Sequence, residues 1–63
     1  MKANVIDGEI RLTFSEYEAE LLKDFIERAL PLVEGCYEEP GDREQTAFAG
    51  QVLVKVENAL ERL

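Results

Sequence analysis

The stretch ANVIDGEIRLTFSEYE, residues 3–18, contains the two signals that decide the fold of this chain. At its centre, Asp7-Gly8 separates two runs of β-forming residues. A two-residue hairpin loop of type I′ needs positive φ at both positions, and Asp-Gly is among the pairs that best tolerate this. At its end, Ser15 and Glu18 have the Ser-x-x-Glu spacing of a capping box, which marks a helix start. The stretch therefore predicts a β-hairpin over residues 2–14, followed at once by a helix.

The register of the hairpin follows from its two-residue loop. That loop pairs Ile6 with Glu9 and Val5 with Ile10. One face is then apolar, and its members are Ala3, Val5, Ile10, Leu12 and Phe14. The opposite face is polar apart from Ile6. Because side chains alternate between the faces of a strand, this pattern predicts a hairpin that packs its apolar face on helices.

A first helix is expected over residues 16–33. Its apolar residues recur with i, i+3, i+4 spacing and form a wide stripe: Leu21, Leu22, Phe25, Ile26, Ala29, Leu30 and Val33. Pro31 lies in the last turns, so a kink or an end near Leu30 is also compatible with the pattern. Gly35 suits the position just after the helix.

A second helix is expected over residues 43–63, after a loop over 34–42. Asp42 and Gln45 have the spacing of another capping box, which makes Asp42 the predicted N-cap. The β-branched residues within Gln51–Val56 favour a strand as the competing interpretation. The 3.6-residue spacing of apolar positions through to Leu63 favours the helix. The chain is thus predicted to be one α+β domain, residues 1–63, with a hairpin packed on an antiparallel helical pair, in the order ββαα and completed by dimerisation.

The net charge of −7 is unevenly distributed along the chain. Residues 16–44 carry ten acids and three bases, whereas residues 1–15 and 45–63 are each neutral. A negative field of this kind repels phosphates and anionic lipid, so we expect no direct binding to nucleic acid or membrane. A basic protein is the more plausible charged partner.

Catalytic and metal chemistry find little support in the composition. The chain has no His, which is the commonest general base and metal ligand, and Ser15 is explained by its capping role. The loop acids lack the calcium-binding EF-hand pattern. Cys36, the only cysteine, is interpreted as a small apolar residue buried beneath the loop, because the neighbouring acids disfavour a reactive thiolate. We expect neither an enzyme nor a cofactor.

One row of acids lies along a side of the first helix at i, i+3 and i+4 steps. Its members, the acidic row, are Glu16, Glu20, Asp24 and Glu27. Spaced carboxylates of this kind are able to imitate a DNA backbone and block a basic nucleic-acid-binding protein. The alternative is a solvated face, which is favoured because Lys23 and Arg28 interrupt the row.

Surplus apolar residues lead to the function expected first, a small acidic homodimer that acts through protein–protein contacts. A chain of 63 residues without disulfide or metal supports only a thin core. Self-association is a direct way to cover what is left over. The predicted dimer surface is Ile6, Ile10, Leu12, Phe14 and Val54.

Two further expectations concern compartment and family. With one cysteine, no apolar leader at Met1–Asp7 and no membrane span, the chain is expected in the cytoplasm. A strand followed by two helices is also the order of ribbon-helix-helix repressors. Those proteins read bases with basic or polar residues on a paired strand, whereas Arg11 stands alone beside Glu9 here. No family is assigned on this basis.

Overall fold

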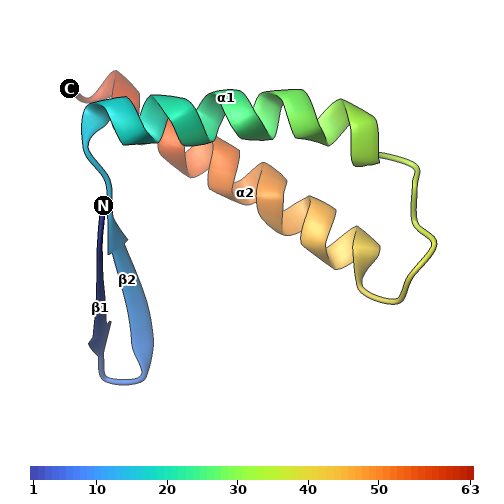
Figure 1. Ribbon diagram of the computed structural model, residues 1–63, viewed down its shortest axis with the longest axis horizontal. Helices are drawn as coiled ribbons and strands as arrows, with labels where there is room; N and C mark the ends of the chain where they lie inside the picture. The colour runs from blue at the N-terminus through green and yellow to red at the C-terminus, as the bar shows by residue number, and fades with distance from the viewer.

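A computed structural model describes all residues from 1 to 63 and contains four elements (Figure 1). They are strands β1 (Lys2–Ile6) and β2 (Glu9–Thr13) and helices α1 (Glu16–Val33) and α2 (Asp42–Glu61). The predicted ββαα order and α+β class are confirmed. The segment Gln51–Val56 is helical, as the apolar spacing indicated.

The hairpin has the predicted register. β1 and β2 are antiparallel, and the pairing runs from Ile6 with Glu9 at the turn to Lys2 with Thr13 at the open end. Asp7 and Gly8 have φ values of 50° and 79°, so both loop positions lie in the left-handed region that a type I′ turn requires. The turn chemistry thus sets which side chains share a face.

Helix α1 begins at the predicted capping box. The Glu18 amide donates to Ser15 Oγ at 3.1 Å, and the Ser15 amide donates to Glu18 Oε1 at 2.9 Å. The helix continues through Pro31 and ends at Val33, after which Gly35 has a φ of 85°. Positive φ just after a helix is the conformation that glycine supplies at least cost.

The start and end of α2 differ from the prediction of 43–63. Asp42 is the first helical residue and not the N-cap, and the helix ends at Glu61. The N-cap is Gly41, with a φ of 94° and no side-chain cap. The Asp42 carboxylate instead accepts hydrogen bonds from the Glu38 and Glu39 amides, at 3.0 and 2.8 Å. Because these loop amides are within its reach, the Asp42 side chain stabilises the loop and does not cap the helix.

The expected packing of the hairpin on the helices is not found. The two strands contact each other and the two helices contact each other, but no strand contacts a helix. The hairpin projects from the start of α1 as a separate arm (Figure 1). Only Phe14 and Ser15 connect β2 to α1, and Ser15 is held extended by its capping role (φ −70°, ψ 165°). This short, fixed connection directs the arm away from the helical pair.

The helical pair contains the whole core, and that core is thin. Ile26 of α1, with 7% of its surface exposed, is the only buried residue of the chain. Around it the half-buried apolar residues of the two helices form the seam, and they include Leu22, Leu30, Leu53, Val56 and Leu60. The molecule measures 34 × 28 × 16 Å, so it is flat.

We predict that Gly8→Val unfolds the arm and leaves the helices intact. A β-branched residue at positive φ costs about 1–2 kcal/mol, which an isolated hairpin cannot absorb. The cross-strand nuclear Overhauser effects between Val5 and Ile10 should disappear, while the helical circular-dichroism signal persists. Gly8→Asn is the control, because Asn tolerates this conformation and should retain the hairpin. Loss of helix in the valine variant would contradict the independence of the arm.

Candidate interaction surfaces

One side of the helical pair is polar, and a groove marks it. The groove has a volume of about 210 Å³ and lies between α1 and α2, where it is lined by Glu20, Lys23, Glu57, Leu60 and Glu61. Successive helical residues are about 100° apart, so these residues all project to the same side of the seam. The pair therefore has an acidic side, defined jointly by both helices.

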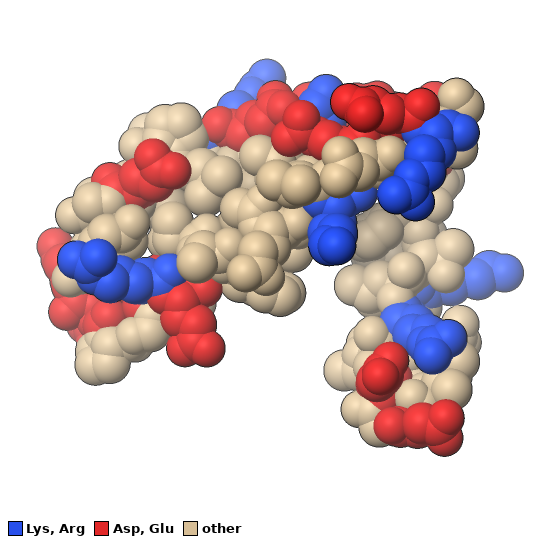
Figure 2. Space-filling view, turned by 180° about the vertical axis from the view of Figure 1, so that it is seen from behind, with Lys and Arg blue, Asp and Glu red and all other residues tan.

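The acidic row extends this side along α1. All four members of the row are exposed, and acidic side chains line the edge of the molecule over α1 (Figure 2). Glu20 is 3.9 Å from Lys23 Nζ, which makes a long, partly solvated ion pair. Such pairs contribute little to stability, so the row remains available to solvent or to a partner.

The opposite side of the seam is apolar. On α1, Phe25 lies about a quarter turn from Ile26, on the side away from Glu20, and on α2, Phe48 projects to the same side. Phe25 is 69% exposed and Phe48 65% exposed. We call this surface the apolar helical face, and its main members are Leu21, Phe25, Leu32, Phe48 and Val52.

The hairpin arm presents a second apolar surface. Val5 and Ile10 are cross-strand partners, and both are about three-quarters exposed, at 76% and 74%. Leu12 is on the same face and exposed, and Phe14 is half-buried at the junction with α1. These residues form a continuous apolar strip with no helix of the same chain over it.

The five residues of the predicted dimer surface do not form one surface. Ile10, Leu12 and Phe14 follow one side of the hairpin, while Ile6 pairs with Glu9 on the other side. Val54 is on α2, in a shallow hollow formed with Ala47, Gly50, Gln51 and Lys55. By helical position this hollow is on the same side of the seam as Glu57 and Glu61, away from the apolar helical face.

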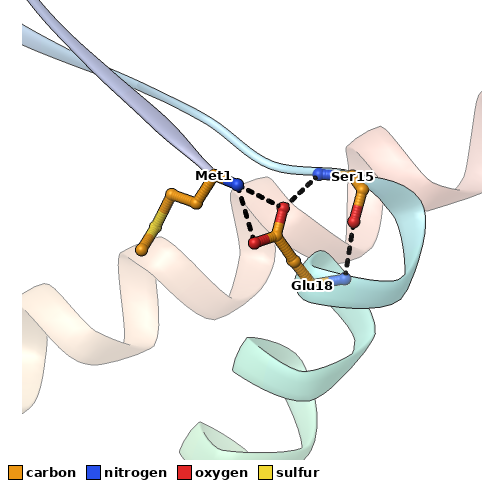
Figure 3. Close-up of polar contacts among 3 residues, drawn as sticks. All are labelled: Met1, Ser15 and Glu18. Atoms are coloured by element: carbon orange, nitrogen blue, oxygen red, sulfur yellow. Dashed lines mark hydrogen bonds and ion pairs between the residues drawn. The ribbon is translucent and has the colours of Figure 1, made fainter.

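Glu18 connects the arm to the helical pair (Figure 3). Its carboxylate accepts from the Met1 ammonium group at 2.8 Å through both oxygens, in addition to the Ser15 amide. The bond to the Met1 ammonium, followed by the bond to the Ser15 amide, lowers the pKa of Glu18 from its ordinary value of 4.5 to about 2. One side chain therefore ties the beginning of the chain, the connector and the first turn of α1 together.

Cys36 lies in the loop between the helices. Cys36 is exposed, so its interpretation as a buried residue is wrong. Its thiol is 3.6 Å from the Leu32 carbonyl oxygen, to which it donates. Arg43 lies over the Tyr37 ring at 4.6 Å and is placed for a cation–π contact. No group of three or more acidic, cysteine or histidine side chains is arranged to hold a metal ion.

The elements and surfaces define a small α+β protein of ββαα order whose exposed features are an acidic side, an apolar helical face and an apolar arm. No protein-family model matches the chain, and comparison with curated proteins and with solved structures finds no match either. Neither helix combines the length and the apolar character needed to cross a membrane.

The Glu18 junction makes a prediction about pH. A carboxyl whose pKa is lowered in the folded state stabilises that state fully above its unfolded pKa. The contribution of Glu18 should therefore be complete above pH 4.5 and be lost as the pH falls toward 2. In a nuclear magnetic resonance titration, the Glu18 carboxyl carbon and the Ser15 amide should move together, with a midpoint near pH 2.

Glu18→Gln is the matched control for this titration. The amide side chain does not ionise, so the acid-dependent shift of the Ser15 amide should disappear. The helix start should persist in part, because Ser15 Oγ still accepts from the amide of residue 18. A parent midpoint at the ordinary value of 4.5 would contradict the junction.

Proposed function

We propose that this protein is a small acidic interaction module that acts as a homodimer in the cytoplasm and has no catalytic activity of its own. The observation that carries the proposal is its exposed apolar surface. Fourteen large hydrophobic residues are exposed against a single buried one. The thiol of Cys36 is free and exposed, and such a thiol persists in a reducing compartment.

The exposed surface area of the chain is larger than that of a compact monomer of the same mass. The chain exposes 5455 Å², whereas a compact monomer of 7.2 kDa is expected to expose roughly 4,100 Å². The excess is roughly 1,300 Å², and a partner in a standard protein–protein interface buries about 800 Å². The radius of gyration, 13.4 Å, likewise exceeds the ~10.6 Å expected for a compact chain of this length. One partner of similar size would cover the excess.

The arm supports the same conclusion independently. A two-stranded hairpin without a surface to pack on is at best marginally stable in water. Val5, Ile10 and Leu12 form such an uncovered strip here. A partner that covers this strip would supply the hydrophobic contact that the helices of the same chain do not make.

We predict a dimer in solution. Light scattering after gel filtration at micromolar concentration should give twice the mass of the chain, 7.2 kDa. The mass should be insensitive to salt, because apolar contacts are not screened as ion pairs are. A monomer mass at every concentration would overturn the proposal.

An acidic inhibitor of a basic nucleic-acid-binding protein is the second candidate. The observation that favours it is the arrangement of the acidic row, whose four members are all exposed along one helix. A dimer formed through apolar surface would leave most of this row free. Carboxylates at regular helical steps could then meet a basic patch.

Charge reversal tests this candidate. Glu20→Lys with Asp24→Lys should abolish binding to a basic DNA-binding protein while helical circular dichroism and dimer mass persist. Parent binding should weaken steeply with salt, because exposed charges are screened over roughly 8–10 Å at physiological ionic strength. Glu38→Lys with Glu39→Lys is the control, since it makes the same charge change in the loop. Equal binding by both double variants would leave the row with a solvating role only.

A further inference from the structure

We propose that the apolar helical face is covered by the same face of a second copy, so that two helical pairs stack into a four-helix core. This inference rests on the proposed homodimer and specifies its interface. It selects the helical face instead of the surface predicted from the sequence, whose residues are divided among different sides of the molecule.

The helical pair has no second layer of secondary structure packed on it. Stable domains consist of at least two layers of secondary structure around one core. The molecule is flat, with a shortest extent of 16 Å, and its two helices pack on each other while the hairpin contacts neither of them. The helices therefore form a single layer with one apolar side. A second layer of the same kind would bury that side.

The apolar helical face contains two exposed aromatic residues. Phe25, near the middle of α1, and Phe48, in the second turn of α2, are both more than half exposed. Aromatic residues gain most from burial in an interface. The excess of roughly 1,300 Å² per chain includes the arm as well as this face, and a standard dimer interface, at about 800 Å² per partner, takes up only part of it.

The charge distribution permits a second copy as the occupant. Two molecules of net charge −7 repel each other unless their acids stay apart. Stacking through the apolar helical face places Glu16, Glu20 and Glu27 of both copies on the outside of the dimer. Asp24 and Arg28, which line one hollow with Leu21 and Phe25, lie at the rim of the contact. Glu18, an acid of α1 that projects toward this face, is paired with the Met1 ammonium group. A twofold axis through the face makes the contact self-complementary.

Photo-crosslinking tests the interface in the intact chain. p-Benzoylphenylalanine replaces Phe25 in one preparation and Val54 in another, since both sites are exposed but lie on opposite sides of the seam. Irradiation of the position-25 protein should give several-fold more covalent dimer, with the crosslink mapped to the apolar helical face of the other copy. A dimer by mass that crosslinks only through position 54, or only to the arm, would overturn this inference and leave the homodimer standing. A monomer would overturn both.

Substitution supplies a second measurement. Phe25→Asp and Phe48→Asp should each raise the dimer dissociation constant at least about a hundredfold, because a twofold interface would bury the new charge twice. Val54→Asp, the control, should dimerise like the parent. A Phe25→Asp protein that dimerises with parental affinity would overturn the inference. If either Asp variant loses its helical circular dichroism, the crosslinking result decides.

Discussion

The contact between α1 and α2 around Ile26 is the interaction on which the rest of this structure depends. It is the only place where the chain excludes water from a side chain. The arm and the long loop are joined to this core only through the ends of the helices. A chain with so small a core has little margin against the entropy of ordering its residues. Association with a partner should therefore stabilise the fold, because the contacts with the partner add buried apolar surface to the only core present.

The division of the helical pair into an acidic and an apolar side gives the protein its chemical character. Glu20 and Phe25 are five residues apart on one helix, yet they project to opposite sides. α2 continues both sides, with Glu57 beside the groove and Phe48 across the seam. The negative charge is thus concentrated where it keeps the protein hydrated. The apolar side carries less charge, and where Asp24 borders Leu21 and Phe25 the oppositely charged Arg28 lines the same hollow.

Local signals made much of the fold predictable. Asp7-Gly8 and the pair Ser15 and Glu18 act within a few residues of one another, so their hairpin register and helix start are confirmed. Asp42 was assigned wrongly because its carboxylate had two sets of amide donors within reach, and the loop backbone decided between them. A capping pattern in sequence does not show which donors the loop presents.

The placement of whole elements was less accessible from sequence. The apolar face of the hairpin correctly indicated a surface to be covered, but not that the helices of the same chain fail to cover it. The apolar stripe that contains Phe25 does not indicate that this residue shares one exposed side with Phe48. That grouping depends on which flanks of the two helices meet at the seam, a non-local property. The width of the stripes was the only sign of it.

The arm also has two open β-edges, because its sheet contains only β1 and β2. An unpaired edge is a template for further strands, and an exposed apolar hairpin is therefore at risk of fibrillar stacking. Lys2, Glu9 and Arg11 place charges along these short strands, and Arg11 is 3.8 Å from Glu9. Addition of a further strand to either edge would desolvate these charges, which makes such addition costly. Lys2, Glu9 and Arg11 thus limit the number of further strands that can add to the arm.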